Sequence, residues 1–390
     1  MILNLKFKSF KILFIFLIIV CVFSCKGTVE NLIKDTYDSR EIRVKIINNK
    51  KVVIENTREL ISDDYITGEI YNFIKKSDSI IFEVNTDGSV LLNGYPFNSQ
   101  LRVLQPDKKL IKMNDRLYPG YFIITALNNE IEVINIVPIE TYLISVVPSE
   151  MPIYFMDEAL KSQAIISRTY ALYSVNRNYN EKNFDLDNTT NYQVYHGLNK
   201  AMKYGLFFKI KNAVGFTKNK ILTYSGQPVV TFFHANSGGE IVSGREYFGA
   251  SADKPYLVGK EDPYSKDFPG YRWTYTMSYE DFKKIFDIFE EPDVAIIEYS
   301  EKGLVSRFLI EDKVFTPKDI RWKIGLIKFK SNKFTITFDQ EKRTIQFDGR
   351  GFGHGVGLSQ WGAQGMALKG YDYKRILQFY YPGTEVVHIK

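Results

Sequence analysis

A carboxylate between two prolines, followed at once by a long helix-forming stretch, is the feature that most constrains this chain. Glu150 lies in the segment Val-Pro-Ser-Glu-Met-Pro over residues 147–152, and residues 158–172 contain no glycine or proline. We expect this amphipathic run to form a buried helix beginning at Asp157, whose side chain can cap the first free amides. The prolines fix the backbone around Glu150, and apolar neighbours could raise its pKa. The pattern therefore favours Glu150 as a general acid.

The alternative for Glu150 is a surface carboxylate in a proline-bounded turn. Hydrolysis of a glycosidic bond normally needs a second acid, and the nearby candidates are Glu140, Asp157 and Glu158. Asp157 and Glu158 are better explained as a helix start. Glu140 is better explained as the residue ahead of a hydrophobic strand over residues 141–147. A reaction that needs only one acid/base group fits the sequence more closely.

The amino terminus has the pattern of an export signal. Basic residues precede an unbroken apolar run over residues 12–23, which ends at Ser24 and Cys25. This run is short for a membrane-spanning helix, which needs about 20 residues. We predict a signal peptide over residues 1–24, a lipidated Cys25, and a polar tether over residues 25–40 that holds the protein to a membrane through the lipid. The alternative is an uncleaved anchor; either way, the body is exported.

The composition excludes several classes of function. The two cysteines, Cys21 and Cys25, both lie in the leader or at its cut, so the folded body has no thiol nucleophile, disulfide or thiolate zinc site. The four histidines lack metal-ligand spacing, and we expect no cofactor and no metal. The net charge of +6 falls to +3 without the three leader lysines, too little and too dispersed for a nucleic-acid partner. Abundant aromatic residues could fill a core or line a carbohydrate groove.

The body is expected to be an α+β fold that is rich in strands. Short strands with turn signals predict a β-rich part over residues 41–135, and the Glu150 segment lies in a catalytic core over residues 136–270. Residues 271–345 contain their own helix, at 278–289, and further strands, and we interpret them as an inserted subdomain. The C-terminal part of the core then covers residues 346–390.

A glycine-rich segment near the C-terminus is the second informative stretch. Glycines at 351, 353, 355 and 357 recur with period two, which predicts an extended strand with one bare face that another backbone or a sugar ring could approach. His354 lies among them and could be a ligand, a base or a buried hydrogen-bonding residue. The spacing does not fit a dinucleotide-binding loop. No serine-nucleophile elbow surrounds Ser237 or Ser359.

Several of these segments together resemble the SpoIID/LytB domain family of bacterial peptidoglycan-remodelling proteins. They occur in the family's order and cover most of the mature chain. The matching segments are residues 137–143, the Glu150 turn with its helix, residues 193–197, the loop Ser237-Gly238-Gly239, residues 353–363, which read Gly-His-Gly-Val-Gly-Leu-Ser-Gln-Trp-Gly-Ala, and residues 376–384.

The resemblance implies a lytic transglycosylase that acts on glycan strands stripped of their stem peptides. Glu150 corresponds to the acid that protonates the oxygen between N-acetylmuramic acid and N-acetylglucosamine. The 6-hydroxyl of the sugar then closes a 1,6-anhydro ring, so no second carboxylate is required. Residues expected to bind the substrate or orient the acid are Gln163, Arg168, Tyr195, Asn236, Ser237, His354 and Gln360.

The resemblance also leaves a rival of another class. Members of the LytB branch enhance a partner amidase, so this chain could bind glycan and stimulate a cell-wall amidase without cutting. A third possibility is a lipoprotein that only adheres to the wall. The chain departs from sporulation members by having Asn191 and Tyr192 where they carry zinc-binding cysteines, and by having Pro119 where an arginine is usual. The metal is therefore not carried over.

Overall fold

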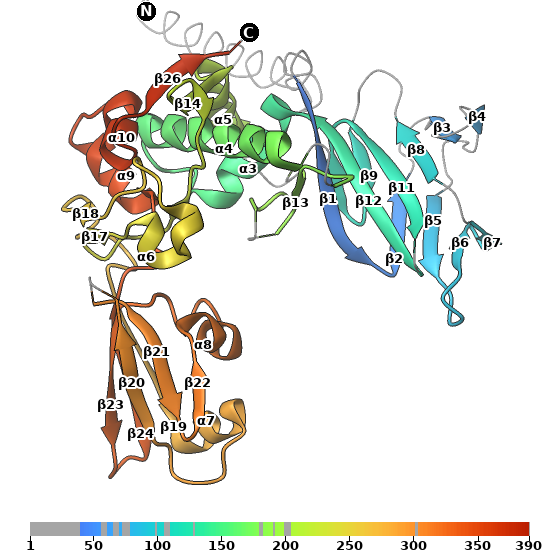
Figure 1. Ribbon diagram of the computed structural model, residues 1–390. Helices are drawn as coiled ribbons and strands as arrows, with labels where there is room; N and C mark the ends of the chain where they lie inside the picture. The colour runs from blue at the N-terminus through green and yellow to red at the C-terminus, as the bar shows by residue number, and fades with distance from the viewer. Residues whose placement is uncertain are drawn as a thin grey trace, which may run out of the picture. The chain divides into compact units, whose positions relative to one another are not determined.

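The computed structural model describes residues 40–55, 61–64, 70–71, 79–97, 100–104, 110–127, 129–178, 182–189, 192–198, 204–300 and 303–389. The predicted signal peptide, Cys25 and all but the last residue of the predicted tether lie outside these ranges. The described chain has the predicted α+β fold and divides into two compact units (Figure 1). The first unit ends at residue 145 and also includes residues 183–200, and the second contains the remaining residues. Among the described residues, no helix is long and apolar enough to cross a membrane.

The first unit contains two mainly antiparallel sheets. The larger has the order β13 (Leu186–Asp187), β1 (Glu41–Asn49), β12 (Glu130–Pro138), β11 (Tyr121–Leu127), β8 (Gln100–Leu104), β3 (Ile61–Asp64) and β4 (Ile70–Tyr71). The smaller has the order β10 (Arg116–Tyr118), β9 (Ile111–Met113), β2 (Lys51–Glu55), β5 (Ser79–Val84), β6 (Val90–Leu92) and β7 (Tyr95–Pro96). Burial alternates along β2, with Val52 and Ile54 fully buried, as expected for strands with one face in a core.

The segment before the proposed acid is a helix, and the predicted strand over residues 141–147 is wrong. Helix α3 runs over Ile139–Glu150 and contains Pro148 in its last turn. Tyr142, Leu143 and Val147 are all fully buried. A short apolar run that is buried on every side has no polar face, so its periodicity cannot distinguish a strand from a helix.

The centre of the second unit is helix α4 (Asp157–Asn178), which begins at Asp157 as predicted. It contacts α5 (Tyr204–Phe216), α9 (Gln360–Leu368), α10 (Tyr373–Tyr380) and β14 (Lys220–Tyr224), which pairs with β15 (Gln227–Pro228) and β26 (Glu385–His388). Every residue from 162 to 169 is buried. The middle of the helix is therefore enclosed on all sides, more completely than in an amphipathic surface helix.

The glycine-rich segment is a loop, and the strand predicted from its period-two glycines is wrong. The backbone φ angles at Gly351, Gly353, Gly355 and Gly357 are 85°, 112°, 80° and 71°. Positive φ angles are outside the strand region and are readily adopted only by glycine. The loop leads into β25 (Leu358–Ser359), which pairs in parallel with β16 (Phe233–His234).

Small elements follow β16. They are β17 (Glu240–Ile241), α6 (Gly244–Phe248), the 3-10 helix η3 (Ala250–Ala252) and β18 (Lys260–Glu261), with β17 and β18 paired antiparallel. Between them run the loops that carry several of the predicted site residues.

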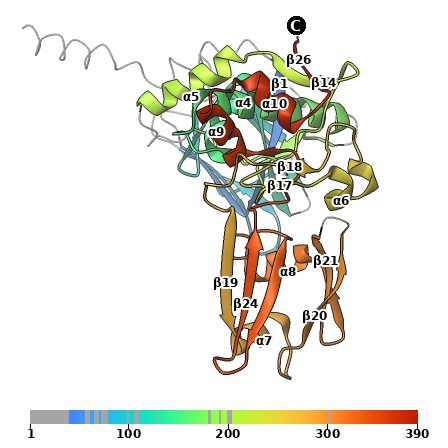
Figure 2. The same cartoon turned by 90° about the vertical axis from the view of Figure 1, so that its left-hand side faces the viewer.

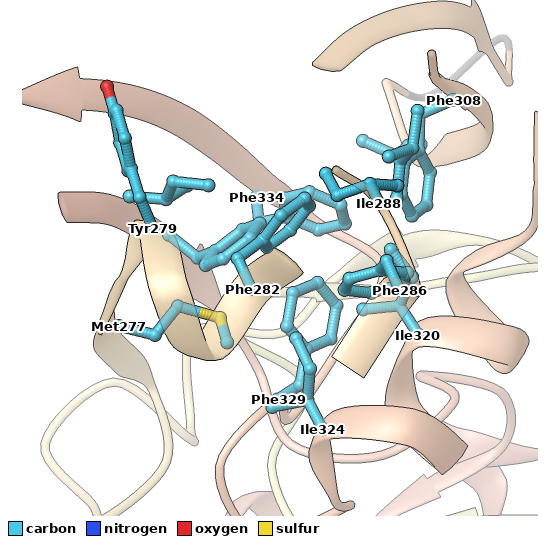
Figure 3. Close-up of a cluster of buried hydrophobic side chains, with 14 of the residues drawn as sticks. Met277, Tyr279, Phe282, Phe286, Ile288, Phe308, Ile320, Ile324, Phe329 and Phe334 are labelled. Carbon is cyan, nitrogen blue, oxygen red and sulfur yellow. The ribbon is translucent and has the colours of Figure 1, made fainter. Parts of the chain in front are cut away.

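Residues 272–350 form two three-stranded sheets and two helices around an aromatic core (Figures 2 and 3). One sheet has the order β19 (Arg272–Ser278), β24 (Thr344–Arg350) and β23 (Phe334–Asp339), and the other β20 (Val294–Tyr299), β21 (Val305–Ile310) and β22 (Lys313–Phe315). The helices are α7 (Tyr279–Phe286) and α8 (Pro317–Ile324). Ser278 caps α7, and the helix ends three residues earlier than predicted because Asp287 adopts a left-handed conformation.

Candidate functional site

Glu150 is the last residue of α3 and is partly exposed. The turn that follows is held by its own backbone: the N–H of Met151 donates to the carbonyl of Val147, and the N–H of Phe155 donates to that of Pro152. The carbonyl oxygen of Glu150 accepts a hydrogen bond of 2.8 Å from the side-chain amide of Gln360. The backbone that carries the carboxylate is thus fixed by a residue 210 positions away.

The same amide connects Glu150 to α4. Gln360 Nε2 lies 3.5 Å from Gln163 Oε1, and Gln163 Nε2 donates to Ser167 Oγ at 3.0 Å. Gln163 and Gln360 are 0% and 7% exposed. Gln360 is the first residue of α9, whose N-cap Ser359 accepts from the N–H of Gly362. The structure therefore brings the Glu150 backbone, Gln163 and Gln360 together, and a role of these glutamines in substrate binding stays a prediction.

An aromatic cluster adjoins this network. The Trp361 ring stacks on Phe268, with centroids 5.0 Å apart and an interplanar angle of 18°, and lies 4.5 Å from the Phe155 ring. Tyr154 packs edge-on against Phe155 and is 68% exposed. An exposed aromatic face four residues after Glu150 offers a surface on which a sugar ring could stack. Sequence reasoning noted the abundance of aromatics but did not single out these residues.

Asn236 and Ser237 form a loop whose polar groups bind protein atoms. The Asn236 amide donates to the carbonyls of Ser265 and Pro269, and its oxygen accepts from the N–H of Gly238. The N–H of Ser237 donates to Ser359 Oγ at 3.3 Å. The loop therefore fixes the N-terminus of α9, and through it the position of Gln360.

Asp262 completes this loop and was missed in the sequence. Its fully buried carboxylate accepts from Ser237 Oγ at 2.7 Å, from the N–H of Tyr264 at 3.1 Å and from the hydroxyl of Tyr380 at 3.3 Å. Burial raises the pKa of the Asp262 carboxyl. A side chain at Gly362 would collide with this group, because an added Cβ would lie 2.0 Å from the Tyr380 hydroxyl oxygen. A single aspartate in a polar stretch gives no local signal of such a role.

His354 and His234 form a neutral pair with rings 5.6 Å apart. The N–H of Val356 donates to Nδ1 of His354, so that nitrogen carries no proton, and burial holds the pKa of His354 well below its usual range. His234 donates from Nδ1 to the carbonyl of Val356, and burial lowers its pKa to about 4. Within the described ranges, no group of three or more metal-ligating side chains surrounds them.

A small cavity of about 20 Å³ connects His354 to the Ser237 loop. His354, Asn236 and Ser237 all line it, together with residues of β17, β24 and the glycine-rich loop. The three predicted binding residues therefore share one cavity. Their link to Glu150 runs through Ser359 and Gln360 rather than through a direct contact.

The side chains of Arg168 and Tyr195 are buried, Arg168 in the second unit and Tyr195 in the first. The Arg168 side chain is 1% exposed, and its guanidinium donates to the carbonyls of Lys220 at 3.1 Å and Val214 at 3.4 Å, which ties α5 to β14. Tyr195 belongs to the first unit, where it is fully buried and its hydroxyl donates to Asn135 at 2.7 Å. These contacts are structural, and a substrate-binding role for either residue stays a prediction.

We expect His234 to make the fold sensitive to acid. Its pKa is about 4 when folded and about 6.5 when unfolded, so below pH 6.5 the unfolded chain binds a proton that the folded chain excludes. Stability is therefore present above pH 6.5 and lost as the pH falls to about 4, by on the order of 3 kcal/mol. Urea unfolding of the wild type and of His234→Asn, which keeps a donor to Val356, should show their stability difference shrinking with acidification. A constant difference would contradict a neutral His234.

The fold and the site define an α+β protein with a partly exposed glutamate whose backbone is held by a buried side-chain amide. The family model described as "SpoIID: Stage II sporulation protein" matches residues 127–224. An uncharacterised protein of Brachyspira hyodysenteriae is 35% identical, over 70% of this chain and 73% of its own length. Stage II sporulation protein D of Bacillus subtilis is 33% identical, over 64% of this chain and 74% of that protein.

The chain therefore belongs to the SpoIID family. A protein of Bacillus subtilis named amidase enhancer is also similar, with 30% identity over 61% of this chain, but only 39% of that protein is covered. The family resemblance inferred from the motifs is thus confirmed.

Proposed function

We propose that this protein is an exported lytic transglycosylase that cleaves peptide-free peptidoglycan with Glu150 as its acid/base group. Membership in the SpoIID family, with relatives named for sporulation and for amidase enhancement, supports a cell-wall-related role. The position of Glu150 carries the proposal: it is a partly exposed carboxylate at a helix end, on a backbone fixed by Gln360. Fixed placement is what proton transfer to a substrate oxygen requires.

The chemistry needs one carboxyl group. The Glu150 carboxyl protonates the oxygen that joins N-acetylmuramic acid to N-acetylglucosamine, and the bond from that oxygen to C1 of the muramic acid breaks. The 6-hydroxyl oxygen of the same sugar bonds to C1, and its proton passes to the Glu150 carboxylate. The products are a free 4-hydroxyl and a 1,6-anhydro end, and the acid is regenerated without water.

The carboxylates that neighbour Glu150 in the sequence form ion pairs or hydrogen bonds elsewhere, which favours a reaction with a single acid. Glu158 pairs with Lys161 at 2.6 Å and accepts from the N–H of Tyr373 at 2.8 Å. Asp157 lies 3.6 Å from the Lys209 ammonium. Both therefore help to anchor α4, and Glu140 is only 1% exposed, so none of these three carboxylates is an evident second acid for a hydrolase.

A test is to incubate the purified protein with peptide-free glycan strands and to analyse the fragments by mass spectrometry. We expect shorter strands that end in 1,6-anhydro-N-acetylmuramic acid. Fragments with reducing ends only would reject the transglycosylase and favour a hydrolase.

The second candidate function is enhancement of a cell-wall amidase, favoured by the similarity to the amidase enhancer. It predicts that glycan length stays constant while a cell-wall amidase added to the same wall preparation releases stem peptides faster. Attachment to a membrane through Cys25 is part of the proposal for either function. It predicts incorporation of a radiolabelled fatty acid, and loss of the label in Cys25→Ala.

A further inference from the structure

Two arginines lie directly opposite each other at one end of the β19–β24–β23 sheet. Arg272 in β19 is the register partner of Arg350 in β24, and both side chains are exposed. Like charges directly opposite on neighbouring strands destabilise a sheet. Among the described residues, neither arginine has an ion pair to an acidic side chain. Within the part of the chain that the structure describes, these two guanidinium groups are therefore not neutralised by an acidic side chain.

Two lysines extend the positive region. Lys333 lies beside Arg350, because the N–H of Arg350 donates to the carbonyl of Lys333. The ammonium group of Lys333 pairs with Glu240 at 2.5 Å. The Lys330 ammonium lies 5.7 Å from the centroid of the Phe352 ring. Among the described residues, Lys333 alone of these four cations pairs with an acid, which favours an anionic ligand at this end of the sheet.

The backbone that carries Arg350 is held rigidly against the predicted site. The carbonyl of Arg350 accepts a hydrogen bond from Ser331 Oγ at 2.7 Å. The next residue, Gly351, lies so close to Gly238 that a Cβ added at Gly238 would be 2.4 Å from the Gly351 nitrogen. Gly238 follows Ser237, which bonds to Ser359 next to Gln360. A continuous set of contacts within one unit therefore runs from Arg350 to the Glu150 backbone.

Arg350 and Lys333 also line the cavity that contains Ser237 and His354. Asn332 lines the same cavity, and its side-chain oxygen is buried without a hydrogen-bond partner in the described chain. A buried acceptor without a donor is costly unless a ligand or water supplies one. The cavity has room for about one water molecule, which can supply that donor, while the exposed guanidinium group of Arg350 stays accessible to a larger ligand outside the cavity.

We propose that Arg350 and Arg272 bind the free carboxylate of an N-acetylmuramic acid residue whose stem peptide has been removed. This inference rests on the proposed function and identifies two residues that select the substrate of the protein. While a stem peptide is attached, the carboxylate is consumed in an amide bond and carries no charge. Arginine suits the role because its planar guanidinium can donate two parallel hydrogen bonds to one carboxylate.

The test measures binding, so that cleavage is not needed. The full chain carrying Glu150→Gln is titrated with labelled peptide-free glycan oligomers, and with the same oligomers after conversion of their carboxylates to methylamides. We expect the free acid to bind roughly tenfold more tightly at low salt. The difference should shrink as salt rises and should be lost in Arg350→Gln and in Arg272→Gln.

The matched control is Arg307→Gln. Arg307 is an exposed arginine that also lies within residues 272–350, and its guanidinium group pairs with Glu298 at 3.3 Å. This variant should keep the preference for the free acid. Equal affinity for acid and amide in the starting protein would overturn the inference, as would equal loss in Arg307→Gln. The outcome is separate from that of the cleavage test, because wild type that cuts nothing can still prefer the acid, and wild type that cuts can bind both alike.

Discussion

Glu150→Gln is expected to abolish measurable cleavage of peptide-free glycan, with a loss of about 10²- to 10⁴-fold or more. The amide has nearly the same shape as the carboxyl group but cannot donate a proton to the glycosidic oxygen or receive one from the 6-hydroxyl. The contact between the Glu150 carbonyl and Gln360 uses the main chain and is retained. Folding and glycan binding should therefore be unchanged. The measurement is the initial rate of anhydro-end formation, followed by mass spectrometry.

The matched control for this variant is Asp157→Asn. Asp157 lies seven residues after Glu150, and its side chain is 68% exposed. Removing its charge should leave the rate within about a factor of two, because an exposed ion pair contributes about 1 kcal/mol or less to stability. If Glu150→Gln cleaves at the wild-type rate, Glu150 is not the acid. If both variants lose activity equally, the loss reflects general damage to the helix start.

Gly357→Ala is expected to destabilise the fold by about 4 kcal/mol or more, an exceptional value for one methyl group. The backbone at Gly357 has a φ of 71°, where an L residue is strained, and an added Cβ would lie 2.0 Å from the carbonyl oxygen of Phe232. That carbonyl accepts from the N–H of Leu358 and from the hydroxyl of Tyr381. The methyl group can be accommodated only if β16 and β25 separate. Urea denaturation followed by circular dichroism measures the effect.

Gly370→Ala isolates the part of this effect that comes from backbone conformation. Gly370 has a φ of 84°, but an added Cβ would meet no atom within 4 Å. We expect a loss of about 1–2 kcal/mol, the usual penalty for an L residue in the left-handed region. Similar losses at the two positions would show that the close approach of Phe232 contributes nothing.

Local patterns were sufficient where one segment determines its own structure. Helix α4 could be predicted from a stretch without helix breakers, and α7 from the capping signal at Ser278. The position of Glu150 next to α4 also followed from the sequence. The predicted strand over residues 141–147 failed because α3 is buried on all sides, and burial is decided by elements distant in the chain.

The glycine-rich loop shows the same limit. A period of two fits a strand, but Gly353 and Gly355 have positive φ angles, and a Cβ added at these positions would collide with His234 and Val242, which are more than 100 residues away in the chain. Asp262 gave no signal at all, because its role depends on Ser237 and Tyr380, which reach it only after folding.

The sequence by itself determined the nature of the proposed acid, the absence of cysteine from the folded body, and the order of motifs that marks the SpoIID family. These are properties of residue type and spacing. Only the tertiary structure decided that Gln360 holds the Glu150 backbone, that His234 and His354 are neutral, and that Arg272 faces Arg350. Each of these depends on contacts and burial among residues far apart in the chain, which no local pattern encodes.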